Sequence, residues 1–389
     1  MRLAIIRQRY TPYGGAERFV EAALEALLER SIAITLYTRS WPQTRLQLIE
    51  PVLCNPPYVG RLWRDRGFAR AVCEKISRHP PELVQSHERL LCCDVFRAGD
   101  GVHQVYLEER LRTASPLERR FLEWSPYHRY VADMERRLFA SPALRAVICN
   151  SKMVKEEIRE RFGFAESALH VIYNAVDSED FSPRLKEHRA PVREKLGVPQ
   201  EATVFLLVGS GYERKGVDRA IRALSRVPGN PWLFVVGRDK ARGRYKRLAQ
   251  ELGIAERVAL LGPQEDPRAF FGAADAFVLP TLYDPCPNAA LEAMACALPV
   301  VTSSKCGAAE LVREHDAGFV CPSSDVESLA WHMTTLCDAT ARATLGERAR
   351  EAVRPLTPDA MTLKLVLLYR DLLAAAHAAG HPTPKPPAR

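Results

Sequence analysis

Residues 204–221 read VFLLVGSGYERKGVDRAI, and they indicate the fold more clearly than any other stretch. An apolar run predicts a buried parallel strand, which Gly209 and Gly211 then end. A helix follows, and the cations of Arg214 and Lys215 lie at its N-terminal end. Because glycines let backbone amides approach a phosphate and a helix N-terminus adds partial positive charge, this stretch predicts a diphosphate site. The glycine spacing matches neither the dinucleotide-binding fingerprint nor the Walker pattern.

The same alternation of strand and helix extends along the chain in both directions. Short apolar runs predict strands at 3–6, 32–37, 83–85, 95–98, 146–149, 204–208, 233–236, 258–261, 276–279 and 300–302. This pattern predicts an α/β protein with two doubly wound, Rossmann-like domains. Ligands of such sheets bind beyond the carboxyl ends of the strands, so we expect the site in a cleft between the domains.

The domain boundaries follow from changes in composition. The polar, proline-containing stretch 178–200 predicts a linker between an N-terminal domain at 1–177 and a C-terminal domain at 201–356. An amphipathic helix is predicted at 357–379, crossing back to the N-terminal domain. The last residues, 380–389, are rich in proline and predict a disordered tail.

The composition excludes several other classes of protein. Of the 389 residues, 47% are hydrophobic and 26% are charged, which excludes disordered, collagen-like and coiled-coil chains. The net charge of +8 suits an acidic substrate, an anionic membrane or nucleic acid. No apolar run has the length of a membrane span or of a signal-peptide core. Ten cysteines without a CxxC spacing predict free, buried thiols in a reducing cytosol.

A second informative stretch, AFVLPTLYDPCPNAALEAMACALPVVTSS, covers residues 276–304. A buried strand ends at Pro280, the next loop carries Asp284, and a helix that follows Asn288 carries Glu292. The two carboxylates can face one site, where they suit acid/base hydrolysis, metal binding or hydrogen bonds to sugar hydroxyls. The sugar interpretation fits best beside a diphosphate site, because a nucleotide sugar has both a ribose and a hexose. A buried structural role is the alternative for Glu292.

Two basic segments suggest a surface partner. Residues 61–78 contain six Arg and Lys side chains against two acids, and residues 106–139 mix seven arginines with aromatic residues and six acids. Rings at headgroup depth and cations on phosphates are typical of a membrane interface, so we predict contact with an anionic inner-membrane surface. A solvated helical face with its rings packed inward is the alternative. Nucleic acid is a poorer fit, because no recognition motif accompanies the charge.

These motifs together resemble the retaining glycosyltransferases of family 4, which have the GT-B fold. The resemblance covers nearly the whole chain and is carried by TPYGGAERF, VICNS, VIYNAVD, GSGYERKGVDRAI, FVVGRDK and the acidic pair. It is greatest to the lipopolysaccharide core glucosyltransferase I group, where RKGVDR and FVVG-x-DK recur. The resemblance implies reaction without a metal or cofactor, and retention of anomeric configuration by front-face attack.

The resemblance also implies a role for individual residues. Arg214 and Lys215 match the pair that neutralises the donor diphosphate, and Glu292 matches the glutamate that holds the ribose. Asp284 stands where the family has a glutamate that contacts the donor hexose, so the sequence departs from the family there. The predicted catalytic residues are Arg214, Lys215, Asp284 and, on the acceptor side, Asp100 or His103. The predicted donor-binding residues are Gly14, Gly15, Gly209, Arg214, Lys215, Asp284, Asn288, Ala289 and Glu292.

Together with the absence of a predicted membrane span, the resemblance implies a cytoplasmic, peripheral transferase that moves a hexose, with UDP-glucose as the expected donor, to a heptose of the lipopolysaccharide inner core. Two alternatives stay open at this point. One is a sugar-nucleotide epimerase of the same fold, which needs additional acid/base carboxylates. The other is a non-catalytic subunit that binds glycans or a membrane partner.

Overall fold

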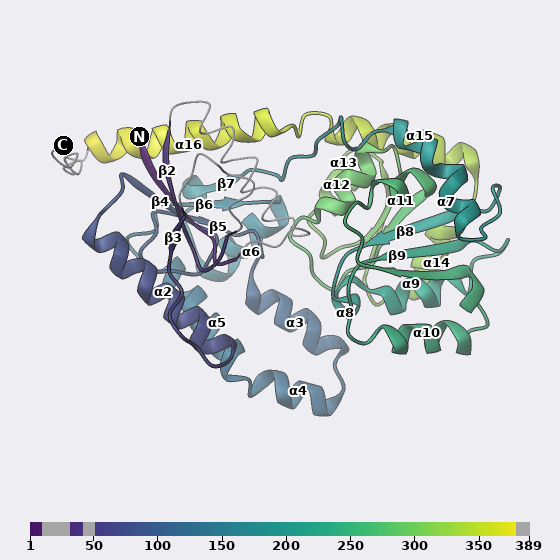
Figure 1. Ribbon diagram of the computed structural model, residues 1–389, viewed down its shortest axis with the longest axis horizontal. Coiled ribbons are helices and arrows are strands. Elements are labelled where there is room, and N and C mark those ends of the chain that lie inside the picture. Colours follow the sequence, from purple (N-terminus) through teal and green to yellow (C-terminus); the bar gives the residue numbers. More distant parts are fainter. Residues whose placement is uncertain (10–31, 42–50, 379–389) are drawn as a thin grey trace. The chain divides into compact units, whose positions relative to one another are not determined.

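The computed structural model describes residues 1–9, 32–41 and 51–378. The chain divides into two compact units, each built on its own parallel sheet (Figure 1). Unit 1 contains Met1–Tyr173 and the C-terminal segment that begins at Pro358, and unit 2 contains Asn174–Thr357. The chain therefore passes from one unit to the other twice.

Unit 1 has a seven-stranded sheet in the order β3-β2-β1-β4-β5-β6-β7, and all neighbouring pairs are parallel. The strands are β1 (Arg2–Ile6), β2 (Ala33–Thr38), β3 (Val52–Leu53), β4 (Leu83–Ser86), β5 (Val95–Arg97), β6 (Ala146–Cys149) and β7 (Leu169–Val171). Every residue of β4, β5 and β6 is buried, as expected for parallel strands with both faces covered.

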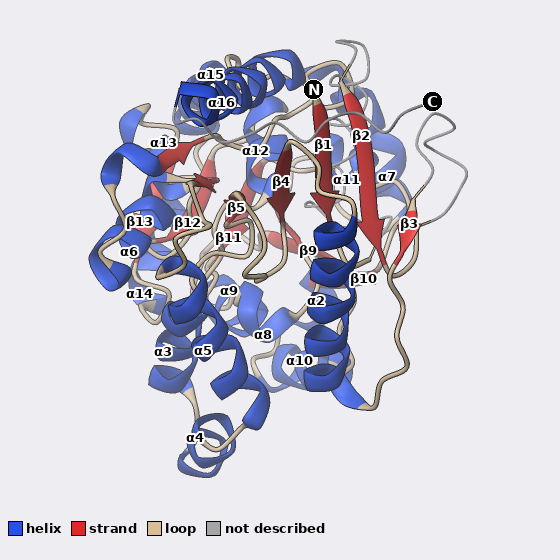
Figure 2. Ribbon diagram, turned by 90° about the vertical axis from the view of Figure 1, so that its left-hand side faces the viewer, coloured by secondary structure: helices blue, strands red, loops and turns tan. Residues whose placement is uncertain are grey.

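Figure 2 shows the helices of unit 1, most of which lie beside this sheet. They are α2 (Gly60–Arg78), α3 (His103–Thr113), α4 (Pro116–Glu123), α5 (Pro126–Phe139), α6 (Lys152–Phe162) and α16 (Pro358–Ala378). A serine starts each of α4, α5 and α6, because its hydroxyl oxygen accepts a hydrogen bond from the backbone amide three residues later. The last helix, α16, is fixed to the sheet by Tyr369, whose buried hydroxyl donates to Gln85 Oε1 at 2.5 Å.

Unit 2 has a six-stranded parallel sheet in the order β10-β9-β8-β11-β12-β13. The strands are β8 (Val204–Val208), β9 (Trp232–Val236), β10 (Val258–Gly262), β11 (Ala276–Leu279), β12 (Val300–Ser303) and β13 (Gly318–Cys321). The helices are α7 (Arg189–Lys195), α8 (Tyr212–Lys215), α9 (Val217–Leu224), α10 (Arg242–Glu251), α11 (Arg268–Ala273), α12 (Asn288–Ala295), α13 (Ala309–Glu314), α14 (Val326–Thr335) and α15 (Ala339–Val353). The order of strands reverses between β8 and β11, which in doubly wound sheets is where ligands bind.

All the predicted strands are present, with each end within one residue of the prediction. The sequence did not indicate β3, β7 and β13, each of which lies at the edge of its sheet. Edge strands are short and partly exposed, so their apolar runs are weak.

Residues 178–200 are not a free linker. They contain a 3-10 helix (Pro183–His188) and α7, and both belong to unit 2. The side chain of Arg193 on α7 is fully buried and pairs with Asp275 at 2.6 Å. This buried ion pair fixes the segment to the sheet, which its polar composition did not suggest. The predicted tail at 380–389 lies outside the described residues.

The prediction that all cysteines are free is wrong for two of them. Cys73 of α2 and Cys92 of the β4–β5 loop form a disulfide, with their Cα atoms 5.7 Å apart. The other eight cysteines are free, and seven of them are buried, as predicted. The pairing depends on how α2 packs against the β4–β5 loop, and the 19-residue separation of the two cysteines does not reveal it.

Candidate active site

The glycine turn after β8 is fixed by the loop that follows β9. Gly209 N donates to Val236 O at 2.8 Å, and Gly211 N donates to Arg238 O at 3.1 Å. The carboxylate of Asp239 accepts from Tyr212 N at 2.7 Å and so satisfies an amide at the start of α8. The four-residue helix α8, which carries the basic pair, is therefore fixed by hydrogen bonds to the end of β9 and to the loop after it.

Two glycines make room for the basic pair. Gly209 has a φ of +157°, and a Cβ there would lie 2.5 Å from Cε of Lys215. Gly216 has a φ of +77°, and a Cβ there would overlap the carbonyl oxygen of Pro280. The Lys215 side chain therefore folds over Gly209, and the end of α8 approaches the end of β11. Arg214 O completes this contact by accepting from Leu282 N at 2.8 Å.

Arg214, Lys215 and Asp284 form one ionic cluster at the carboxyl ends of β8 and β11. Asp284 Oδ2 accepts from Lys215 Nζ at 2.6 Å and from Arg214 NH1 at 2.9 Å. The side chains of Lys215 and Asp284 are each 9% exposed, whereas that of Arg214 is 37% exposed. One carboxylate thus faces two cations, so the cluster carries a net positive charge. The partly exposed guanidinium of Arg214 makes this charge accessible at the surface of unit 2.

The buried setting shifts the acid–base behaviour of this cluster. Burial would raise the pKa of Asp284, but Lys215 and Arg214 outweigh it, so this pKa lies below its ordinary value. Burial and the charge of Arg214 lower the pKa of Lys215, and Asp284 opposes that effect. The Asp284 carboxylate is therefore ionised at neutral pH and compensates the buried ammonium group.

The loop after Asp284 leads into α12, and Asn174 holds the two together. Asn174 Nδ2 donates to Cys286 O at 3.0 Å and to Asn288 Oδ1 at 2.6 Å. Asn288 and Ala289 are half-buried in the first turn of α12, while Glu292, one turn later, is only 5% exposed. Asn174 belongs to the VIYNAVD motif, so it is a supporting residue of this loop that the sequence did not assign.

Unit 2 thus brings together Arg214, Lys215 and Asp284, and Gly209 lies against the side chain of Lys215. Asn288, Ala289 and Glu292 follow on α12 from the same loop. Gly14 and Gly15 lie outside the described residues. The sequence missed Asp239 and Asn174, because their partners are backbone and side-chain groups far away along the chain. The FVVGRDK and VIYNAVD motifs were the only signals that could have indicated them.

Asp100 and His103 belong to unit 1, at the start of α3. Asp100 is exposed, and His103 is half-buried with its Nε2 at 3.0 Å from His128 Nδ1. Burial, together with the charge of Arg89 and the contact with His128, lowers the pKa of His103 to about 3. The imidazole of His103 is therefore neutral at physiological pH, where it can form hydrogen bonds but carries no charge.

The two basic segments of unit 1 form α2 and the α3–α5 region. Leu117 and Phe121 on α4 and Trp124 at its C-cap are 66%, 71% and 69% exposed and share one face. Phe139, one of the aromatic residues of the segment 106–139 for which a membrane contact was predicted, is buried and stacks on Phe162 with ring centroids 4.4 Å apart. The alternative, a ring packed inward, therefore holds for Phe139. The exposed aromatic surface is smaller than the number of aromatic residues in 106–139 suggested.

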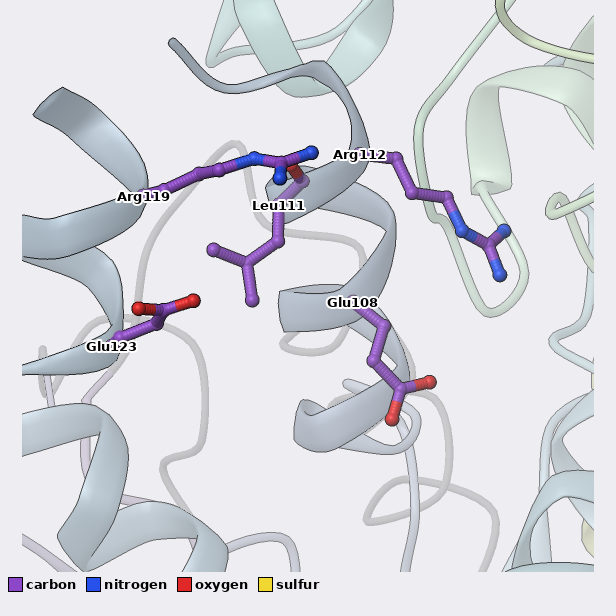
Figure 3. A pocket seen from close by; sticks show the side chains of 5 residues that line it. All are labelled: Glu108, Leu111, Arg112, Arg119 and Glu123. Carbon is purple, nitrogen blue, oxygen red and sulfur yellow. The ribbon is translucent and has the colours of Figure 1, made fainter. Parts of the chain in front are cut away.

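A shallow pocket of about 280 Å³ separates α3 from α4 (Figure 3). Its lining residues are Glu108, Leu111, Arg112, Arg119 and Glu123. Arg119 Nε donates to Leu111 O at 2.9 Å, and this bond ties the two helices together beside the pocket. None of the predicted site residues lines it. Among the described residues, no group of three His, Cys, Asp or Glu side chains is arranged to hold a metal ion.

Comparisons with known proteins agree with this arrangement. The family model Glycosyltransferase Family 4 matches residues 13–180, and the model Glycosyl transferases group 1 matches residues 188–352. Lipopolysaccharide glucosyltransferase WaaG of Escherichia coli (strain K12) is 24% identical, over 82% of this chain and 85% of its own. Lipopolysaccharide core biosynthesis glycosyltransferase LpsE of Rhizobium meliloti (strain 1021) is 27% identical, over 87% of this chain and 91% of its own.

Solved structures show the same fold. A crystal structure of WaaG, a glycosyltransferase involved in lipopolysaccharide biosynthesis, has a TM-score of 0.80 and 23% identity, covering 93% of this chain and 98% of that chain. Anabaena HepE in complex with UDP-glucose has a TM-score of 0.73 and 20% identity, covering 95% of this chain and 100% of that chain.

Two parallel-sheet units of this kind constitute the GT-B fold, which confirms the predicted fold class. The chain belongs to the glycosyltransferases in which a family 4 domain precedes a group 1 domain. The resemblance to the lipopolysaccharide core glucosyltransferase I group, which the sequence motifs indicated, is also confirmed.

Proposed function

We propose that this protein transfers a hexose from a nucleotide sugar, with UDP-glucose as the expected donor, to a heptose of the lipopolysaccharide inner core, with retention of anomeric configuration. The observation that carries the proposal is the ionic cluster of Arg214, Lys215 and Asp284 at the strand ends of unit 2. The similarity to WaaG and LpsE supports the acceptor class, and the similarity to HepE supports the donor.

The basic pair would stabilise the leaving diphosphate. As the bond between the sugar and the diphosphate breaks, negative charge grows on the diphosphate oxygens. Arg214 and Lys215 are already fixed in place by Asp284 and by the backbone around α8, so they need little reorganisation during the reaction. These two cations would supply the charge stabilisation that a metal ion provides in other transferases, so we propose a reaction without a metal.

The two carboxylates would fix the donor. Glu292, buried on α12, would accept hydrogen bonds from the ribose hydroxyls, and Asp284 would accept from the hexose while it orients the basic pair. Asp284 has one methylene group fewer than the glutamate of the family, so the hexose would approach this loop closely. Asp100 or His103 in unit 1 would contact the acceptor.

A panel of nucleotide sugars tests the proposed reaction. Wild-type protein should hydrolyse one donor slowly by itself and transfer its hexose to a heptose-containing acceptor. Arg214→Ala should lower kcat/KM about 100-fold, the usual effect of losing one preorganised charge stabiliser. Arg222→Ala is the matched control, because Arg222 is an exposed arginine on α9 of the same unit. Conversion of the donor sugar without an acceptor would instead support an epimerase, and near wild-type kinetics for Arg214→Ala would refute the diphosphate assignment.

We also propose that α4 contacts an anionic membrane surface. Leu117, Phe121 and Trp124 lie at i, i+4 and i+7, so they share one exposed face. None of the helices among the described residues is both long and apolar enough to cross a bilayer. A surface contact of this kind therefore depends on side chains that reach the headgroup layer.

Vesicle sedimentation tests the membrane contact. Binding to anionic vesicles should weaken as salt rises, since screening acts within roughly 10 Å at 0.1 M salt, and neutral vesicles should bind poorly. Replacing Phe121 and Trp124 by alanine should reduce binding, whereas Trp331→Ala, which removes an equally exposed indole from unit 2, should not. Equal binding by both variants would refute the role of α4.

A further inference from the structure

The start of helix α3 is capped by a side chain from another helix. The residue before α3, Val102, provides no side-chain hydrogen bond to the first turn. The carboxylate of Glu135 on α5 instead accepts from His103 N at 2.7 Å and from Gln104 N at 3.3 Å. A carboxylate accepts hydrogen bonds from the free amides of a helix N-terminus and its charge is favourable there, and Glu135 is only 1% exposed.

Arg89 of the β4–β5 loop completes this arrangement. Its guanidinium lies 2.9 Å from Glu135 Oε1, and its NH2 donates to Gly101 O at 3.2 Å. Burial would lower the pKa of Arg89, but the charges of Glu135 and Asp100 raise it above its ordinary value. Arg89 therefore compensates the buried carboxylate, binds the backbone just before α3 and lies in the field of Asp100.

The same face of α5 contributes a second contact. His128 lies seven residues, or about two turns, before Glu135, and its Nδ1 is 3.0 Å from Nε2 of His103. The two rings are stacked with their centroids 5.1 Å apart. Arg89, His128 and Glu135, which we call the α3 clamp, thus hold both the backbone and the ring of His103, as well as the backbone next to Asp100.

We propose that Glu135, together with Arg89, is a positioning residue of the acceptor-side site, which sets the orientation of Asp100 and His103 toward the acceptor. This inference rests on the proposed function, in which one of these two residues contacts the acceptor. Two of the contacts, to Gly101 O and to the ring of His103, satisfy no free amide of the helix start, so capping alone does not account for them. Each contact also fixes a backbone or side-chain atom within one residue of Asp100 or His103.

Glu135→Gln is the informative variant because it keeps the shape of the side chain and removes its charge. The amide can accept from only one of the two backbone amides with its oxygen, and its NH2 group faces Arg89 or the other amide without an acceptor. The segment before α3 should then move by up to about 1 Å, a misplacement that can cost on the order of 100-fold in rate. We therefore expect transfer to fall about 10- to 100-fold.

The experiment compares transfer, donor hydrolysis and UDP binding in one series of purified full-length proteins. For Glu135→Gln, we expect a lower kcat for transfer, a lower ratio of transfer to hydrolysis, and an unchanged Kd for UDP by calorimetry. Arg89→Lys keeps the positive charge but shortens the reach to Gly101 O, so it should show a smaller loss in the same direction. Glu156→Gln is the matched control, since it neutralises an exposed, ion-paired glutamate on α6 of the same unit.

The outcomes separate this inference from the proposed function. Equal transfer by Glu135→Gln and wild type would overturn the positioning role and leave the proposed function intact. A fall in transfer, hydrolysis and UDP binding by the same factor would also overturn it, because that result indicates a loss of folded protein. If wild type turned over no nucleotide sugar at all, both would be overturned. Should Glu135→Gln fail to fold, Arg89→Lys decides by the same three measurements.

Discussion

Replacing Asp284 by asparagine should destabilise unit 2 and make it depend on a bound diphosphate. The asparagine keeps the shape of the side chain but leaves Lys215, with 9% of its side chain exposed, without a charged partner for its ammonium group in the ionic cluster. Breaking a buried ion pair from one side costs about 3–5 kcal/mol, and the retained side-chain shape favours the lower end of that range. For a domain of this size, 1 kcal/mol corresponds to roughly 2–4 °C, so the Tm should fall by about 6–12 °C.

Thermal unfolding with and without UDP measures both parts of this prediction. The diphosphate would compensate Arg214 and Lys215 in place of the lost carboxylate, so UDP should raise the Tm of Asp284→Asn by at least as much as that of wild type. Asp338→Asn is the matched control, because Asp338 caps α15 in the same unit and asparagine caps a helix equally well. A Tm within 2 °C of wild type, or a variant that UDP no longer stabilises, would refute the role assigned to Asp284.

Three further predictions follow from the same unit. Glu292→Gln should weaken the binding of UDP and of the UDP-sugar alike, whereas Asp284→Asn should weaken the binding of the UDP-sugar only. Calorimetry with both ligands measures this, and an equal loss of affinity for both ligands in both variants would contradict the two roles. Asn174→Ala removes two hydrogen bonds that fix the loop before α12, so it should raise the KM for the donor several-fold. An unchanged KM would show that the loop keeps its conformation without Asn174. Because the pKa of Asp284 is depressed in the folded protein, the contribution of its carboxylate to stability is complete above about pH 4 and is lost as the pH falls through that depressed pKa. The difference in stability between wild type and Asp284→Asn should therefore shrink in acid denaturation curves.

The strands and the basic pair could be predicted because their signals are local. Buried parallel strands are continuous apolar runs, and a glycine turn followed by Arg214 and Lys215 lies within one stretch of sequence. The position of Asp284 relative to this pair follows from the rule that strand ends of a parallel sheet meet at one edge. That Asp284 binds both cations could not be predicted, since it depends on the close approach of Gly216 to Pro280.

The supporting residues could not be predicted because each acts on a partner distant in sequence. Asp239 caps α8 across 27 residues, Glu135 caps α3 across 32, and Asn174 reaches the loop before α12 across more than 100. Polar side chains at such positions look like ordinary surface residues in a sequence. The disulfide of Cys73 and Cys92 was missed for the same reason, because only the packing of α2 brings the two thiols together.

The return of α16 to unit 1 has a consequence for synthesis of the chain on the ribosome. Unit 2 is one continuous segment, Asn174–Thr357, and can complete its sheet while the ribosome is still adding the last residues. Unit 1 cannot be completed at that stage, because the hydroxyl of Tyr369 that occupies Gln85 Oε1 is translated 284 residues after the strand it binds. The part of unit 1 that is translated first must therefore wait, with Gln85 still lacking the hydroxyl of Tyr369, until α16 has been made. A chain that terminates early, just after Thr357, would release a finished unit 2 attached to an unfinished unit 1, which is the form that chaperones and proteases recognise.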